Sequence, residues 1–345
     1  MHIDSIRQRL RALGALPVHE QRVLRDWVQV RPWDQGRRRP KDFLPQTLRA
    51  ALPEIETELR GIVRLLSSHP VADDPGSARL LVGLQDGQTV ESVLLPRGGL
   101  CVSSQIGCAV GCQFCMTGRD GLLRQLTSGE IVAQVALARS QRTVKKVVFM
   151  GMGEPAHNLN NVMEAIELLG SEGNIGHKNL VFSTVGDPRV FERLPQGPVK
   201  PALALSLHTT KAELREKLLP RAPRLTPKEL VELGEEYGRT TAYPVQYQWT
   251  LLDGINDGED EIEGIVALFK GKYAVLNIIP YNTVPDLAFR RPETERCREM
   301  IRILHRRGVL AKLRDSAAQE VDGGCGQLRA RALATEQRSI PIQPA

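Results

Sequence analysis

Apolar and charged residues are mixed at helical spacing along the first part of the chain. Three such stretches predict amphipathic helices: residues 6–13, 18–30 and 54–66. A basic, proline-containing linker, residues 31–45, separates the second stretch from the third. Turn-forming residues crowd positions 70–78, and we expect a domain boundary there. The pattern therefore divides the chain into three parts: a helical accessory domain over 1–75, a core over 76–335 and a tail over 336–345.

From residue 79 the pattern changes to short apolar runs. Residues 80–96 predict two strands around an Asp-Gly turn. Further apolar runs then alternate with helical segments, of which one begins at the capping box of Thr127 and Glu130. Six β/α units and one extra strand result, which favours a parallel sheet with outer helices. The predicted fold class is α/β, and six units fit a partial (β/α)6 barrel better than a closed eight-fold one.

Three cysteines follow the first strand of the predicted barrel. Cys108, Cys112 and Cys115 have the spacing C-x3-C-x2-C. A structural zinc site takes four protein ligands. A cubane iron–sulfur cluster has four irons, so three thiolates leave one iron open. The spacing therefore predicts a metal centre with an open position, and a zinc site completed by a distant residue or a set of buried thiols is the alternative.

Polar residues end several of the other predicted strands. A Gly-Met-Gly-Glu-Pro turn at 151–155 follows one strand, and its Glu154 can accept hydrogen bonds from an amino group. Strand ends also carry Ser183, Ser206 with His208, and Asn282. Active sites of such folds lie at the carboxyl ends of the strands, which makes these residues candidates for ligand contacts. The alternative is that each is an ordinary cap or a satisfied polar group.

Composition narrows the role of the remaining cysteines. Six cysteines in 345 residues are too few for a disulfide scaffold and are more typical of metal ligands or catalysts. Cys101 and Cys325 lie outside the triplet, and burial as inert thiols is the alternative for both. Cys297 falls in a predicted helix and is expected to be inert.

Charge points to a polyanionic partner. The formal net charge is +6, and residues 290–314 hold nine Lys or Arg against three Glu. A second basic run covers residues 37–41. Such clusters suit nucleic acid, with a solvated helix face as the alternative. Because no apolar run is long enough to span a membrane and the N-terminus does not resemble a signal peptide, we expect a cytoplasmic protein without membrane contact.

The motifs, taken in order over residues 80–330, resemble the RlmN/Cfr family of radical S-adenosylmethionine (SAM) enzymes, which methylate an adenine carbon in RNA. The resemblance is carried by the following segments: 101–105, the cysteine triplet, 151–155, 206–208, 255–258, 280–282 and 325–328. It implies a 4Fe–4S cluster held by the triplet and a bound S-adenosyl-L-methionine. The positions that match the family's SAM contacts are Gly153, Glu154, Ser183, Ser206, Leu207, His208 and Asn282.

The resemblance also implies a mechanism for the two remaining cysteines. Cys325 matches the cysteine that a first SAM methylates, and Cys101 matches the one that later forms a transient disulfide with it. Glu91 matches the proton acceptor. Direct methyl transfer fails because an adenine C2 or C8 carbon is not a nucleophile, whereas a thiolate is one. The implied substrate is ribosomal RNA, with transfer RNA as an additional target. An electron donor such as flavodoxin and a monomeric state are expected.

Several choices stay open at this point. The segment 316–324 before Cys325 departs from the acidic stretch usual in the family, so the chain fits a divergent branch with its own target. The motifs do not decide between C2 and C8. A radical SAM enzyme acting on a small molecule, or an RNA-binding protein with a structural or redox cluster, is the competing interpretation.

Overall fold

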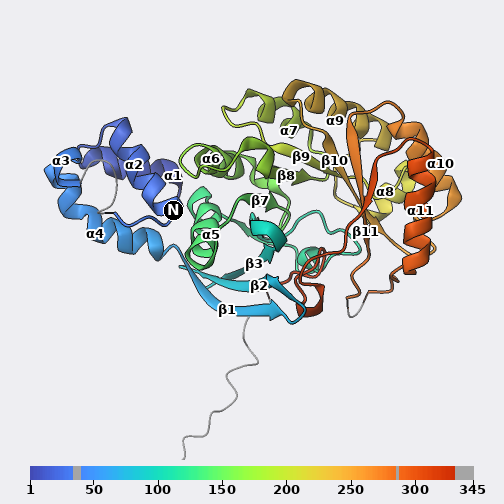
Figure 1. The fold of residues 1–345 in the computed structure, drawn as a ribbon, viewed down its shortest axis with the longest axis horizontal. Helices are drawn as coiled ribbons and strands as arrows, with labels where there is room; N and C mark the ends of the chain where they lie inside the picture. The colour runs from blue at the N-terminus through green and yellow to red at the C-terminus, as the bar shows by residue number, and fades with distance from the viewer. Residues whose placement is uncertain (34–39, 285–286, 331–345) are drawn as a thin grey trace, which may run out of the picture.

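The computed structural model describes residues 1–33, 40–284 and 287–330. Its first part is helical and lies beside the larger sheet-containing part (Figure 1). The helices of this part are α1 (Ile3–Ala12), α2 (Pro17–Val28), α3 (Pro40–Phe43) and α4 (Gln46–Arg60). The predicted helices at 6–13 and 18–30 are thus present. The predicted tail over 336–345 lies outside the described residues.

The helix predicted over 54–66 is wrong in its second half. Helix α4 ends at Arg60, and Val63 begins a strand, β1 (Val63–Val71), which pairs antiparallel with β2 (Asp74–Leu84). Gly61 is a poor helix former, and the Ile62-Val63 pair that follows is β-branched and suits a strand. The turn residues at 70–78 therefore include a hairpin connection, and the division at residue 75 stays a prediction.

Within the described residues the main sheet has ten strands in the order β1-β2-β3-β4-β7-β8-β9-β10-β11-β12. The first four strands pair antiparallel, and those from β4 to β12 pair parallel. The remaining strands are β3 (Thr89–Leu95), β4 (Gly99–Cys101), β5 (Gln105–Gly107), β6 (Leu122–Gln125), β7 (Lys146–Phe149), β8 (Leu180–Thr184), β9 (Ala202–Ser206), β10 (Val245–Leu251), β11 (Ala274–Pro280) and β12 (Ala311–Leu313). Strands β5 and β6 form a separate pair. The sheet ends at β1 and β12 without closing, which confirms the predicted α/β class and the partial barrel.

Helices cover the outer face of the curved parallel strands (Figure 1). They are α5 (Ser128–Gln141), α6 (Leu159–Gly170), α7 (Pro188–Arg193), α8 (Ala212–Leu218), α9 (Pro227–Thr241), α10 (Glu259–Phe269) and α11 (Thr294–Arg306). The predicted capping box of Thr127 and Glu130 begins α5, and Thr226 with Glu229 begins α9 in the same way. The core between sheet and helices is apolar, with Trp249, Tyr247 and Phe149 among its largest buried side chains.

The N-terminal helices are fixed to the start of α5. The backbone N–H of Ile3 donates to the Ser128 hydroxyl at 2.9 Å, and Gly129 donates to the Met1 carbonyl at 3.2 Å. A Cβ at Gly129 would lie only 2.4 Å from that Met1 oxygen, so the close approach requires glycine. Among the helices that the structure describes, none is both long and apolar enough to cross a membrane.

Candidate active site

The three thiols of the triplet lie in the loop between β5 and β6. Cys108 directly follows β5, and Cys115 directly precedes the short helix Met116–Gly118. The Cys108 side chain is buried, and Cys112 and Cys115 are half-buried. The loop folds back on itself, since the Cys108 N–H donates to the Gly121 carbonyl at 2.9 Å. The triplet packs in one cluster with Val185, Leu252 and Tyr281, which directly follow β8, β10 and β11, so it lies at the carboxyl ends of the parallel strands, where the sequence predicted a site.

The electrostatics of the triplet fit a cationic metal centre. Burial raises the pKa of the Cys108 thiol to about 12 and that of Cys112 well above its ordinary value, and negative charge on Cys115 raises both further. In the described residues no three His, Cys, Asp or Glu side chains converge on a single ion. A cubane does not require such convergence, because each thiolate binds a different iron. Three mutually repelling thiolates are the donor set that the cationic core of an iron–sulfur cluster would neutralise.

Glu154 follows β7 and faces the triplet. Its backbone N–H donates to the Gln105 side chain at 2.6 Å, and its carboxylate accepts from the N–H groups of Ala156 and Val185, both at 3.0 Å. Burial raises the pKa of Glu154 to about 7, although these amide bonds act in the opposite direction. In the described conformation the carboxylate therefore holds the ends of β7 and β8 together.

Gly153 shows why this turn is rich in glycine. Its φ of 103° lies in the region that favours glycine, and an added Cβ would come within 2.5 Å of the Gln105 Cβ. The turn can pass this close to the strand β5 only without a side chain at that position.

The residues at the ends of β8 and β9 meet the cysteine loop. Ser183 and Ser206 are half-buried at these ends, and Leu207 is fully buried. His208 packs edge-on against Phe114 of the cysteine loop, with ring centroids 4.8 Å apart. Burial lowers the pKa of His208 to about 3, and its Nδ1 accepts from the Thr250 N–H at 2.9 Å. The imidazole is thus neutral and positions the loop.

Asn256 supports the rim of the site, by which we mean the residues that follow β8, β9 and β10. The sequence assigned no role to Asn256. Its side-chain N–H donates to the carbonyls of His208 at 2.7 Å and Thr250 at 2.8 Å, and its oxygen accepts from the Leu252 N–H at 2.7 Å. His208 has a φ of 65°, an uncommon conformation that this hydrogen bond supports. The signal in the sequence is the Asn-Asp-Gly turn at 256–258, which was noted only as a motif.

Cys325 reaches the site on a C-terminal loop that docks against the cysteine loop. The Met116 N–H donates to the Gly326 carbonyl, and the Thr117 hydroxyl donates to the Leu328 carbonyl, both at 2.7 Å. The Asn282 amide donates to the Cys325 carbonyl at 3.0 Å. Asn282 was predicted to contact SAM, and in this conformation its amide group anchors the loop that carries Cys325.

Cys101, Cys115 and Cys325 line one cavity of about 170 Å³. Part of the Cys325 side chain is accessible to solvent, yet the surrounding protein buries it enough to raise its pKa. Burial also raises the pKa of Cys101, and negative charge on Cys325 adds to this. All six cysteines are free thiols in the structure. The fold therefore lines one cavity with two thiols that lie 224 positions apart in the sequence and that only the family resemblance had linked.

Glu91, in β3, is fully engaged with the C-terminal segment. Its carboxylate forms an ion pair with Arg79 and accepts from the backbone N–H groups of Arg329 at 2.8 Å and Ala330 at 2.9 Å. Arg79, which sequence reasoning missed, also donates to the Val321 carbonyl. In this conformation Glu91 holds the C-terminal segment on the sheet.

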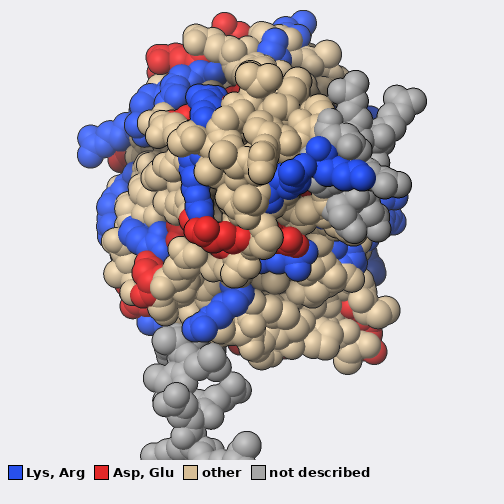
Figure 2. Space-filling model, turned by 90° about the vertical axis from the view of Figure 1, so that its left-hand side faces the viewer, with Lys and Arg blue, Asp and Glu red and all other residues tan. Residues whose placement is uncertain are grey.

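The basic segment 290–314 is largely neutralised within the protein. Arg296 pairs with Glu259 and Glu299, and Arg307 pairs with Glu263. Arg302 and Arg298 both pair with Glu295. Residues 37–39 of the other basic run lie outside the described residues. On the face that carries the N-terminal helices, basic and acidic side chains are interspersed (Figure 2).

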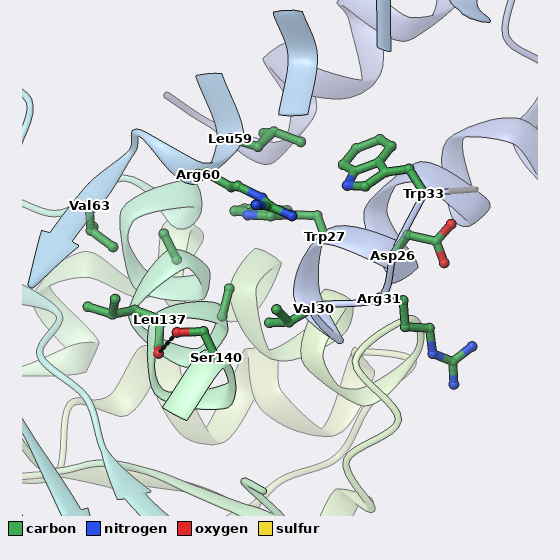
Figure 3. A pocket seen from close by; sticks show the side chains of 12 residues that line it. Asp26, Trp27, Val30, Arg31, Trp33, Leu59, Arg60, Val63, Leu137 and Ser140 are labelled. Atoms are coloured by element: carbon green, nitrogen blue, oxygen red, sulfur yellow. Dashed lines mark hydrogen bonds between the residues drawn. The ribbon is translucent and has the colours of Figure 1, made fainter. Parts of the chain in front are cut away.

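A larger cavity lies away from this chemistry. Its volume is about 320 Å³, and side chains of α2, α4 and α5 line it (Figure 3). Trp27 and Trp33 contribute to its wall, whereas none of the predicted site residues does. The smaller cavity at Cys325 is the candidate active site because the reactive side chains converge there.

Comparisons with known proteins agree with this geometry. Residues 102–268 match the Radical SAM superfamily. The chain belongs to this superfamily, whose members use a 4Fe–4S cluster and SAM. A crystal structure of a radical SAM methyltransferase from Sphaerobacter thermophilus superposes with a TM-score of 0.82 at 34% identity, over 96% of this chain and 98% of that chain.

Sequence relatives cover the whole chain. A protein of Leptothrix cholodnii named as a probable RNA methyltransferase is 71% identical over 344 residues, which is 100% of this chain and 99% of that protein. One of the same name from Pseudomonas aeruginosa is 64% identical over 348 residues, all of both chains. The resemblance to the RlmN/Cfr family is thus confirmed by the radical SAM domain and by relatives named as probable RNA methyltransferases.

Proposed function

We propose that the protein is a radical SAM methyltransferase that methylates an adenine carbon, C2 or C8, in RNA. The main observation behind this proposal is the cavity that Cys101 and Cys325 share with Cys115 of the triplet. A radical SAM enzyme that only cleaves its cofactor has no need for two further thiols beside the cluster loop. The names of the relatives support RNA as the substrate class.

In this proposal Cys108, Cys112 and Cys115 hold the cluster, and the strand-end residues bind SAM. When bound, the cofactors supply an electrophilic methyl group and, after one-electron reduction by a donor such as flavodoxin, a carbon radical. The Cys325 sulfur accepts the methyl group as a thiolate and carries its carbon to the adenine ring. Once the adduct has lost its unpaired electron, which would return to the oxidised cluster, and its ring proton, the Cys101 thiolate attacks the Cys325 sulfur. The disulfide forms, the bond between sulfur and the transferred carbon breaks, and that carbon keeps the electron pair and takes up a proton to become the methyl group.

Glu91 is the proposed acceptor of the ring proton, but its carboxylate must first be released from other groups of the protein. Its carboxylate is occupied by Arg79 and by two backbone N–H groups of residues 329–330. Both oxygens of the carboxylate thus already accept hydrogen bonds from within the protein. Proton removal by Glu91 therefore requires that residues 329–330 first leave it.

Phosphate contacts are proposed next to the cysteine loop. Arg221 donates to the Ala109 carbonyl at 3.0 Å, and both Arg221 and Arg224 are exposed without a carboxylate in ion-pair distance in the described parts of the chain. The arginines of α11, in contrast, are largely paired with acidic residues. Arg221 and Arg224 are therefore better candidates for positioning an RNA backbone than the α11 set.

The test compares RNA nucleosides by mass spectrometry. RNA from cells with and without the gene should differ in 2-methyladenosine or 8-methyladenosine, which also identifies the carbon. Purified Cys325→Ala should keep its cluster and lose RNA methylation, because the methyl acceptor is gone. Cys297→Ala is the matched control, since Cys297 is a buried thiol in α11 outside the cavity. Full methylation by Cys325→Ala would refute the proposal.

A further inference from the structure

One deeply buried cation lies next to the cysteine loop. Arg215, in α8, is 3% exposed, and its Nη2 donates to the carbonyls of Val185 and Ser206, the latter at 3.2 Å. Its Nε is buried without a hydrogen-bond partner. Among the described residues no carboxylate lies within ion-pair distance of this guanidinium. Arginines are almost never this buried unless an anion pairs with them.

The surroundings of Arg215 connect it to the triplet. The Gln113 N–H, between Cys112 and Phe114, donates to the carbonyl of Leu218 at the end of α8 at 3.0 Å. Leu218 also packs in one apolar cluster with Cys108 and Phe114. Burial lowers the pKa of Arg215 to about 10, and the negative charge of Cys112 acts in the opposite direction. The guanidinium is therefore charged at neutral pH and within electrostatic reach of the Cys112 thiolate.

The two carbonyl partners fix where this charge sits. Val185 immediately follows β8, and Ser206 ends β9. By bonding both, the guanidinium ties together the carboxyl ends of two neighbouring parallel strands. Neutral carbonyls accept its hydrogen bonds but do not compensate its charge, so the fold presents a fixed positive charge to whatever anion occupies the cysteine loop.

A 4Fe–4S centre with three thiolates is such an anion, and reduction adds one more negative charge to it. Net charge and hydrogen bonding around a cluster set its reduction potential. We propose that Arg215 is a positioning residue that places a buried positive charge beside the Cys112 thiolate and thereby stabilises the reduced state of the cluster. This inference rests on the proposed cluster site at Cys108, Cys112 and Cys115.

The test measures the midpoint reduction potential of the reconstituted cluster. The enzyme is titrated anaerobically with dithionite, and the reduced cluster is followed by electron paramagnetic resonance. Arg215→Gln removes the charge, so reduction should become at least about tenfold less favourable, which is 59 mV for one electron. Arg215→Lys keeps the charge and should stay near the wild-type potential.

Arg221→Gln is the matched control. Arg221 contacts the same loop through the Ala109 carbonyl, but it is exposed, and water and salt screen its charge. Its loss should shift the potential much less than Arg215→Gln does. Equal shifts in the two variants would overturn the assignment of the effect to the buried charge.

Thermal unfolding of the cluster-free protein separates charge from scaffolding. Stability should follow the hydrogen bonds to Val185 and Ser206, so both Arg215→Lys and Arg215→Gln should melt below the wild type. The potential should instead follow the charge, so only Arg215→Gln should shift it. A wild-type potential in a folded, clustered Arg215→Gln variant would overturn the inference. A wild-type protein that binds no cluster would refute the proposed cluster site itself, which is a different result.

Discussion

Replacing Asn256 by alanine is the most direct test of how the rim is built. Asn256 is fully buried and makes three hydrogen bonds of 2.7–2.8 Å to backbone groups of Leu252, Thr250 and His208. Leaving a buried polar group unpaired costs about 1–3 kcal/mol. Because neighbours relax into part of the space, we expect a total loss of about 3 kcal/mol. For a chain of 345 residues that corresponds to a fall in melting temperature of about 4 °C.

The same substitution should weaken SAM binding. His208 has a φ of 65° and is held there by the bond from Asn256 to its carbonyl. Such a conformation costs about 1–3 kcal/mol, and release from it would reduce ligand affinity roughly tenfold.

Differential scanning calorimetry of the cluster-free protein and equilibrium dialysis of the reconstituted protein with labelled SAM measure the two effects. Asn160→Ala is the control, because Asn160 is exposed and accepts one bond, from Arg193 at 2.6 Å. It should change the melting temperature by less than about 1 °C. An Asn256→Ala protein that melts with the wild type and binds SAM normally would show that this account of the rim is wrong.

Three further predictions concern the glycine-rich turn at 151–155, the stability of the protein at acidic pH and the attachment of the C-terminal segment. Gly153→Ala should lower both melting temperature and SAM affinity, measured as above, because its φ is 103° and no space remains for a Cβ. Burial alone would raise the pKa of Glu130, but the hydrogen bonds and charge of Arg124 together with the hydrogen bonds from Thr127 outweigh it and hold the pKa below its ordinary value. The ionised Glu130 carboxylate therefore stabilises the fold at neutral pH, and this contribution is lost on acidification through the lowered pKa. Glu130→Gln should flatten the acid side of a plot of melting temperature against pH. Glu91→Gln should speed tryptic cleavage after Arg329, as seen by mass spectrometry, because the carboxylate holds that backbone; unchanged cleavage would contradict this.

Local patterns were enough to predict most of the barrel. The capping box at Thr127 acts between residues three apart, and apolar runs such as β8 and β9 are buried on both faces of a parallel sheet. The strand β1 was missed because the apolar residues after Gly61 fit a helix as well as a strand, and only pairing with β2 decides between them. Strand ends then indicated where the site lies.

The parts of the site that the sequence missed depend on partners distant along the chain. Arg215 is one of several charged residues in α8, and nothing nearby in sequence marks it as the one that turns inward to Val185. The ion pairs that reduce the basic excess of the segment 290–314 were missed for the same reason. Counting charges ignores Glu259 and Glu263, which belong to α10 and pair with Arg296 and Arg307 only in the folded chain.

The altered sequence before Cys325 is compatible with the position of this thiol, because many of the contacts that anchor it are made to backbone carbonyls. Met116 and Thr117 donate to the carbonyls of residues 326 and 328, and Asn282 donates to the carbonyl of residue 325 itself. Arg79 donates to the carbonyl of residue 321. Every amino acid offers such a carbonyl. The segment 316–324 can therefore differ from the usual family pattern and still bring Cys325 to Cys101, provided that a hydroxyl remains at Ser316, which accepts from the Asn282 amide at 2.8 Å, and a small apolar residue at the buried Ala318.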